Sequence, residues 1–340
     1  MELRRHVETL TYRGMLGLPE RVQRVLAGRR VVHNGQTLAA DMQLMLRLAR
    51  VAREPGLGDL PIPEGRRLYR RQAALVGGSQ PVGAVRDLEV AGRPGRLYVP
   101  TAAPDRGPLL VFLHGGGWVL GDLETHDPVC RYLAERARVR VLALDYRLAP
   151  EHPFPAAYDD CLAAYRWVVE HAAGVGADPA RLAVGGDSAG GTLAATVAIA
   201  AAREGLPLVF QLLVYPGCDM RGGTESREAY GEGLVLDRRF MDLAAQCYLP
   251  RPDDVLDPRA SPLLADVPTG LAPAYVATAG FDPLRDEGEA YARRLADAGA
   301  EVELRRFRDQ VHGFLQMVGS GRTPRLAVAE VADRLGAALR

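Results

Sequence analysis

The sequence is poor in cysteine, shows no excess of either charge and contains no long apolar run. Its 340 residues include 42 Lys and Arg against 42 Asp and Glu, so the formal net charge is zero. Such a balance gives no reason to expect nucleic acid or an anionic membrane as a partner. No stretch reaches the roughly eighteen uninterrupted apolar residues of a membrane span, and no apolar core of signal-peptide length follows the first residues. We therefore expect a soluble, cytoplasmic protein.

Cysteine and histidine are placed too irregularly to hold a metal ion. The four cysteines are far apart in the chain: Cys130, Cys161, Cys218 and Cys247. Without metal-ligand spacing, and in a cytoplasmic protein, we interpret them as free buried thiols. The seven histidines show no metal-ligand spacing either, so no metal site is expected.

Apolar runs of strand length alternate with helical stretches over most of the chain. Six such runs are Leu109–Leu113, Val139–Leu144, Leu182–Gly185, Leu208–Val214, Ala274–Ala279 and Val302–Phe307. A hairpin pattern, Val85–Val90 and Arg96–Val99, precedes them. Strand–helix alternation is typical of a mainly parallel sheet covered by helices on both faces. The sequence therefore predicts an α/β fold with eight strands.

Two segments do not fit the strand–helix alternation. Residues 1–80 have helical patterns. Residues 216–269 are too long for a simple crossover, and combine a polar, glycine-rich loop at 221–232 with a helical pattern through Phe240, Leu243 and Cys247. Insertions of this size often form a lid or a binding wall. We expect both segments to form a helical cap over a core built from residues 81–215 and 270–340.

A serine lies at a tight turn between a predicted strand and a predicted helix. The turn is Gly186-Asp187-Ser188-Ala189-Gly190, and it joins an apolar run to an alanine-rich run. Glycines on both sides permit a sharp turn that strains the central residue and exposes its side chain. This pattern is typical of a nucleophile elbow, with Ser188 as the nucleophile. We expect Asp187 to support the turn.

A serine nucleophile needs a base and a group that orients the base. His312 follows the last predicted strand, and Asp282 follows the strand before it, so both lie where the carboxyl edge of the sheet is expected. The chain order of serine, aspartate and histidine is that of α/β-hydrolases. Asp286 and Glu287 compete with Asp282 as the acid. Both would begin the following helix, where carboxylates favour the N-terminus, so we assign the acid to Asp282.

Three glycines follow the strand Leu109–Leu113, in the motif His-Gly-Gly-Gly-Trp. Their backbone N–H groups can approach a substrate oxygen without obstruction, and together with the N–H of Ala189 they would form an oxyanion hole. The candidate donors are Gly115, Gly116 and Gly117, of which two are expected to donate. His114 comes too early in the chain to serve as the base, and we expect it to support this loop.

Five motifs in this order resemble the bacterial hormone-sensitive lipase family (family IV) of carboxylesterases. They are His-Gly-Gly-Gly-Trp at 114–118, Asp-Tyr-Arg-Leu-Ala-Pro-Glu at 145–151, Gly-Asp-Ser-Ala-Gly at 186–190, Asp-Pro-Leu-Arg-Asp-Glu at 282–287 and His-Gly-Phe at 312–314. The resemblance implies an α/β-hydrolase fold with a helical cap, hydrolysis of short- to medium-chain acyl esters, no cofactor and frequent homodimers. The long segment before the glycine loop departs from the family pattern.

The substrate pocket is the least defined part of the prediction. Trp118 follows the glycine loop, and Phe240, Met241 and Ala244 lie on the predicted helix of the insertion, so these four residues are candidates to line an acyl pocket. Core packing explains them equally well. Two other functions stay open: an amidase would use the same triad, and a binding module is possible because the plant gibberellin receptor resembles this family. That receptor lacks the catalytic histidine, whereas His312 is present here.

Overall fold

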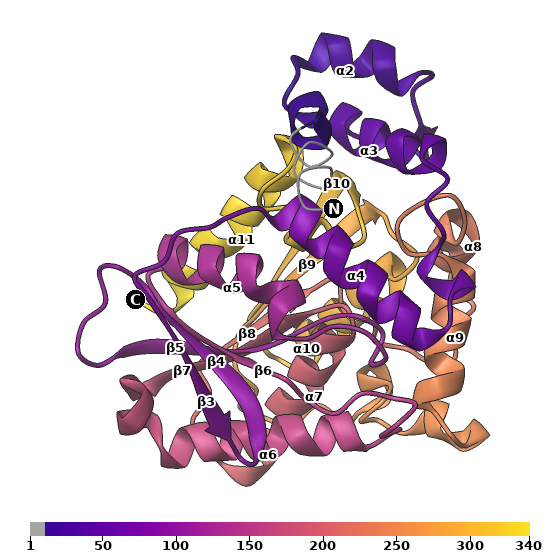
Figure 1. Cartoon of the computed structure of the whole chain (residues 1–340). Helices are drawn as coiled ribbons and strands as arrows, with labels where there is room; N and C mark the ends of the chain where they lie inside the picture. The colour runs from indigo at the N-terminus through magenta and orange to yellow at the C-terminus, as the bar shows by residue number, and fades with distance from the viewer. Residues whose placement is uncertain (1–10) are drawn as a thin grey trace.

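An eight-stranded sheet forms the centre of the computed structural model, which describes residues 11–340 (Figure 1). Its strands, in spatial order, are β10 (Val302–Val311), β9 (Ala274–Phe281), β8 (Phe210–Val214), β7 (Ala177–Asp187), β5 (Gly107–Leu113), β6 (Arg140–Leu144), β4 (Arg93–Val99) and β3 (Ala84–Val90). The strands from β10 to β6 are parallel, and β4 and β3 form an antiparallel hairpin on one edge. The predicted α/β fold with eight mostly parallel strands is confirmed.

Helices cover both faces of this sheet. The helices that pack on it are α5 (Leu123–Ala137), α6 (Ala156–Glu170), α7 (Ala189–Glu204), α10 (Arg285–Asp297) and α11 (Thr323–Ala338). Side chains of α5 and α11 form one buried cluster with the sheet, and those of α6, α7 and α10 form the cluster on the opposite face (Figure 1). The fully buried strands β5 and β6 are apolar apart from Arg140 at the start of β6, because both faces of the sheet are covered.

The N-terminal segment is mainly helical. Residues 11–16 are helical, and three longer helices follow: α2 (Glu20–Ala27), α3 (Ala40–Val51) and α4 (Ile62–Gly77). A small hairpin of β1 (Val32–His33) and β2 (Gln36–Thr37), which the sequence analysis does not predict, separates α2 from α3. The part of the helical prediction that covers residues 1–10 lies outside the described residues.

The insertion is more helical than predicted. It contains α8 (Glu225–Tyr230) and α9 (Arg238–Tyr248), with single 3₁₀ turns near residues 252–256 and 262–264. Because α8 lies within residues 221–232, the prediction of a loop there is wrong. The side chain of Thr224 caps α8 by accepting a hydrogen bond from the Arg227 N–H. The N-terminal segment contacts α8 through a hydrogen bond between His33 Nδ1 and Tyr230 Oη of 2.8 Å.

The expected absence of a membrane span and of disulfides can be compared with residues 11–340. Within these residues no helix is both long and apolar enough to cross a membrane. All four cysteines are free; Cys130, Cys161 and Cys218 are buried, as predicted, while Cys247 is partly exposed. Burial raises the pKa of the three buried thiols well above its usual value, so they remain protonated.

Candidate active site

Ser188 lies at the turn between β7 and α7 with a strained backbone. Its φ is +54°, in the region that residues with a side chain rarely adopt. A Cβ on Gly186 or on Gly190 would collide with the Leu113 carbonyl oxygen of the neighbouring strand, so both positions require glycine. The Ser188 N–H donates to the Val214 carbonyl at 2.9 Å. The turn is therefore held between β5 and β8, with the serine at the N-terminus of α7.

Two neighbouring parallel strands bring His312 and Asp282 together. Val311, the last residue of β10, is in register with Phe281, the last residue of β9, so the next residues of both strands meet. The His312 Nδ1 atom lies 2.8 Å from Asp282 Oδ2, and His312 Nε2 lies 2.9 Å from Ser188 Oγ. Since a carboxylate only accepts, Nδ1–H donates to Asp282 and the serine hydroxyl donates to Nε2.

Asp282 is fully buried, and its second oxygen has its own donor. Oδ1 accepts the Leu284 N–H at 2.8 Å, so both carboxylate oxygens are bonded. His312 is held on its other side by the ring of Tyr215, with ring centroids 4.5 Å apart. The imidazole orientation is thus fixed by a carboxylate at one edge and an aromatic ring against one face.

The contacts of the glycine loop after β5 exclude one of the three candidate oxyanion donors. The Gly115 N–H donates to Asp187 Oδ1 at 2.9 Å, so it is not available to a substrate, and we remove Gly115 from the oxyanion donors. Gly116 and Gly117 line the cavity in front of Ser188 together with Ala189. Their backbone N–H groups have no acceptor among residues 11–340. Both glycines have positive φ, at +123° and +62°, which only glycine adopts without strain.

Asp187 connects the serine turn to the glycine loop, as its predicted support role requires. Besides Gly115, its Oδ1 accepts from His126 Nε2 at 3.1 Å, while Oδ2 lies 3.4 Å from Tyr215 Oη. Burial opposes ionisation of this carboxyl, but the attraction of His126 holds its pKa below the usual range. The contact with His126 was missed in the sequence because α5 meets β7 only in the folded chain.

His114 supports the glycine loop from beneath. Its Nδ1 lies 2.9 Å from the Gly115 carbonyl, and its ring stacks on Tyr146 with centroids 4.2 Å apart. Tyr146 Oη in turn donates to the His114 carbonyl at 2.6 Å. Burial lowers the pKa of His114 to about 4, so the imidazole is neutral near pH 7. Among residues 11–340 no hydrogen bond joins His114 to Ser188 or His312, so His114 is not placed to take the serine proton.

A cavity of about 930 Å³ opens in front of Ser188 and His312. All four candidate pocket residues line it: Trp118, Phe240, Met241 and Ala244. Three of them, Trp118, Phe240 and Ala244, are also buried in the core, so the packing interpretation holds for them as well. Methionines and leucines from the N-terminal segment contribute much of the opposite wall. The sequence indicates Leu46 and Leu48 only as the apolar face of a helix, and none of these N-terminal residues was predicted to line the pocket, because their helices carry no motif.

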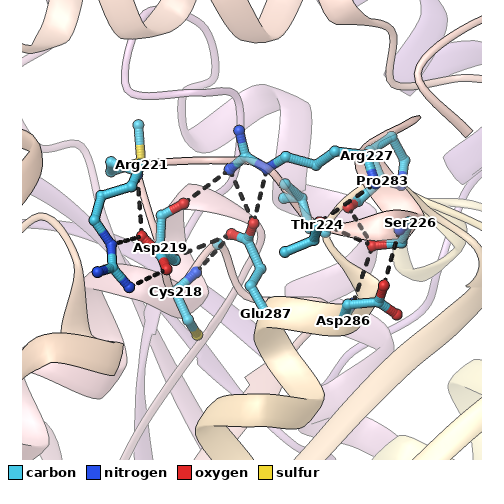
Figure 2. Close-up of polar contacts among 12 residues, drawn as sticks. Cys218, Asp219, Arg221, Thr224, Ser226, Arg227, Pro283, Asp286 and Glu287 are labelled. Atoms are coloured by element: carbon cyan, nitrogen blue, oxygen red, sulfur yellow. Dashed lines mark hydrogen bonds and ion pairs between the residues drawn. The ribbon is translucent and has the colours of Figure 1, made fainter. Parts of the chain in front are cut away.

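Polar side chains connect the insertion to the first turn of α10 (Figure 2). The Arg227 guanidinium on α8 pairs with Glu287 on α10 at 2.9 Å and also donates to the Asp219 carbonyl at 3.0 Å. The other Glu287 oxygen accepts the Cys218 N–H at 2.8 Å. Glu287 is fully buried, and this desolvation raises the pKa of its carboxyl despite the nearby Arg227.

Asp286 makes a second contact between α10 and α8. Its carboxylate accepts the Ser226 N–H at 2.8 Å, and the Ser226 hydroxyl donates to the Pro283 carbonyl at 2.7 Å (Figure 2). Asp286 and Glu287 do lie in the first turn of α10, as expected. Their carboxylates bind the insertion, however, so the explanation by helix-end electrostatics alone is incomplete. Neither carboxylate reaches His312, whose Nδ1 is bonded to Asp282.

Within residues 11–340 no cluster of histidine, cysteine, aspartate or glutamate side chains has the arrangement of a metal site. Around Ser188 the cavity presents a hydroxyl, an imidazole paired with a carboxylate, and backbone N–H groups without an acceptor among residues 11–340. Together these groups can activate a hydroxyl nucleophile and stabilise an oxyanion.

Comparison with protein families and characterised proteins gives consistent matches. A family profile described as alpha/beta hydrolase fold matches residues 110–316. Among curated proteins, the chain is 47% identical over 316 residues to "Carboxylic ester hydrolase LipN" of Mycobacterium tuberculosis, covering 89% of this chain and 84% of the relative. It is 40% identical to "Ethyl acetate hydrolase" of Pseudomonas putida, covering 83% of this chain and 93% of the relative.

Solved structures of similar proteins share the architecture. An alpha/beta hydrolase enzyme from the metagenome of Lake Arreo superposes with a TM-score of 0.85 at 42% identity, covering 88% of this chain and 98% of that one. An esterase from Pyrobaculum calidifontis gives a TM-score of 0.81 at 37% identity, covering 86% of this chain and 99% of that one.

Proposed function

Because the chain belongs to the alpha/beta hydrolase family, in its hormone-sensitive-lipase-like branch, and is a carboxylic ester hydrolase, we propose that it works through Ser188, His312 and Asp282. The observation that carries this proposal is the continuous contact from Ser188 Oγ to His312 Nε2, at 2.9 Å, and from His312 Nδ1 to Asp282, at 2.8 Å.

In the proposed first step, His312 Nε2 takes the Ser188 proton while Oγ attacks the ester carbonyl carbon. Asp282 holds the imidazole in the required tautomer and stabilises the imidazolium that forms. The tetrahedral intermediate then collapses, and the alcohol leaves with the proton from His312. An acyl-serine ester remains on the enzyme.

In the second step, His312 takes a proton from a water molecule, and the resulting oxygen nucleophile attacks the acyl carbon. Collapse of the second intermediate returns the proton to Ser188 and releases the carboxylic acid. We assign the oxyanion donors to the N–H groups of Gly116, Gly117 and Ala189, since these line the cavity beside Ser188. Loss of one such donor typically costs about 3 kcal/mol of transition-state stabilisation.

The proposed substrates are uncharged esters with short to medium acyl chains. The residues facing the cavity are mostly apolar, and its arginines are already paired: Arg221 with Asp219, Arg227 with Glu287 and Arg238 with Glu228. A paired arginine offers little attraction to an anionic substrate, whereas apolar walls favour hydrocarbon. We further propose that residues 1–80 and 216–269 act as a cap that shapes this cavity over a core of residues 81–215 and 270–340.

Hydrolysis of a series of p-nitrophenyl esters, from acetate to long-chain acyl groups, tests both parts of the proposal. We expect a maximum kcat/KM at short to medium chains. Ser188→Ala should retain less than a few per cent of the activity on every ester. A Ser188→Ala variant with substantial activity would remove the nucleophile from the proposal, and a maximum at long chains would overturn the substrate assignment.

A further inference from the structure

On helix α2 three aliphatic side chains face solvent, while the polar side chain of Gln23 faces the protein. Val22, Val25 and Leu26 are 38%, 79% and 38% exposed, whereas Gln23 is buried. The Gln23 side chain donates to the Leu16 carbonyl at 2.6 Å. An amphipathic helix that packs only on its own domain normally has the opposite orientation. The exposed face of α2 is therefore suited to an apolar partner.

Basic residues lie next to this aliphatic face in the chain. Arg21 lies on α2, and Arg29 and Arg30 directly follow it; all three are exposed and have no acidic partner among residues 11–340. Residues 11–54 contain eight arginines against three acidic residues, whereas the whole chain has no net charge. The chain contains no lysine, so all of its 42 Lys and Arg residues are arginines, whose guanidinium binds phosphate with two parallel hydrogen bonds. The neutral overall balance thus conceals a local excess of positive charge.

The same N-terminal segment also lines the cavity in front of Ser188. Met15, Met45, Leu46 and Leu48 face the cavity from residues 11–51. Helix α2 packs against α3, which carries three of these four side chains, and Figure 1 shows α2 as the outermost element on that side. The N-terminal segment therefore has an aliphatic and basic surface on α2 and contributes apolar side chains to the wall of the cavity.

From these observations we propose that Val22, Val25 and Leu26, with Arg21, Arg29 and Arg30, form an N-terminal patch that docks on an anionic lipid surface. The aliphatic side chains enter the headgroup region, and the arginines bind the phosphates. Charge complementarity favours this occupant over an uncharged surface, and the exposed aliphatic side chains favour it over a nucleic acid. Docking would place α3, which carries part of the cavity wall, close to the lipid surface.

Vesicle binding tests the proposal without any turnover, so it stands or falls separately from the assignment of the triad. The full chain is sedimented with vesicles of phosphatidylcholine alone and of phosphatidylcholine with 30% phosphatidylglycerol. We expect at least tenfold stronger binding to the anionic vesicles, and weaker binding as the salt concentration rises. Two variants, Val22→Ser with Val25→Ser, and Arg29→Ser with Arg30→Ser, should each weaken binding at least fivefold.

A matched control uses exposed residues elsewhere: Leu256→Ser with Arg308→Ser. This control should bind as wild type, and thermal unfolding should show that all variants are folded. Absence of binding by the wild-type chain, or equal binding by the patch variants, would overturn the proposal. So would a dimer in light scattering that Val25→Ser dissociates, because the patch would then be an interface between two copies.

Discussion

Asp282 and Asp286 are four residues apart, yet their carboxylates face different parts of the molecule. Asp282 binds the imidazole of His312 and the Leu284 N–H, whereas Asp286 binds the Ser226 N–H of the insertion. Only the first carboxylate can set the tautomer of His312, the proposed base. The two residues thus give a matched pair for testing the catalytic acid.

We expect Asp282→Asn to lower kcat on a soluble ester by about 10³ to 10⁴, because the amide favours the wrong imidazole tautomer. Asp286→Asn should change kcat less than about tenfold. Steady-state kinetics of both purified variants provide the measurement, with thermal unfolding to confirm that each is folded. The reverse ranking would transfer the role of acid to Asp286.

The buried side chain of His114 should make the stability of the folded protein sensitive to acid. Burial lowers its pKa from 6.5 to about 4, so between these values the unfolded chain binds a proton that the folded chain does not. Stability is therefore lost as the pH falls through this window, by on the order of 3 kcal/mol. The carboxyl of Asp187, whose pKa is lowered, loses its contribution only at lower pH, below about 3.8.

Denaturant unfolding of wild type and His114→Gln at pH 7 and at pH 4 measures this contribution. The wild-type protein should lose more stability over this range than the variant, by on the order of 3 kcal/mol. Groups that titrate in both proteins, such as Glu287, contribute equally to both stability changes and cancel in the comparison. Parallel pH dependence of the two proteins would show that His114 stays protonated or exposed in the fold.

At the scale of elements, the attachment of α8 to α10 depends on a buried ion pair. Arg227→Met leaves Glu287 buried without its cation, which typically costs about 3 to 5 kcal/mol. The stability lost in Arg227→Met should increase as the pH rises above the raised pKa of Glu287. In the variant the buried carboxyl must either ionise without a cation or keep its proton, and keeping the proton costs more free energy at higher pH. The control is Arg238→Met, which breaks an exposed pair with Glu228 and should cost less than about 1 kcal/mol.

Unfolding by urea at pH 5 and pH 8 measures both variants, and the KM for a p-nitrophenyl ester reports on the cavity wall. We expect Arg227→Met to raise KM because Met220 and Leu234 lie on the insertion that it loosens. Equal stability losses in the two variants would mean that the Arg227–Glu287 pair is no more important than a surface pair.

The elements that the sequence predicts well are those with long, local patterns. The buried strands and the helices between them are clear from apolar runs and alternation, and their ends differ from the structure by a few residues. The short elements are less visible. Helix α8 has only six residues and depends on the Thr224 cap and on the distant Asp286, so its local sequence resembles a polar loop.

Considered over the whole molecule, sequence motifs indicate the three proposed catalytic residues but not the contacts that support them. Chain order places Ser188, Asp282 and His312 at one sheet edge, and the structure brings their side chains into contact. The supporting contacts of Asp187 with His126 and of His312 with Tyr215 join residues far apart in sequence, so no local pattern predicts them. No local pattern predicts that the Gly115 N–H is bonded to the Asp187 carboxylate and so cannot bind a substrate oxygen.

Net charge illustrates the same limit for the molecular surface. The equal numbers of acidic and basic residues gave no sign of an anionic partner, but the N-terminal segment alone is strongly basic. Long-range attraction depends on how charges are distributed over a surface, and the total for the chain does not report this. The N-terminal patch became visible only when exposure and helix orientation were known.

Covalent labelling of the serine tests the central claim most directly. The wild-type chain is treated with a fluorophosphonate, and the intact mass and the modified peptide are measured by mass spectrometry. A serine activated by His312 should be labelled once, on Ser188, with slower labelling in His312→Ala and none at this site in Ser188→Ala. Labelling at another residue, or an unlabelled wild-type protein that still hydrolyses esters, would contradict the account.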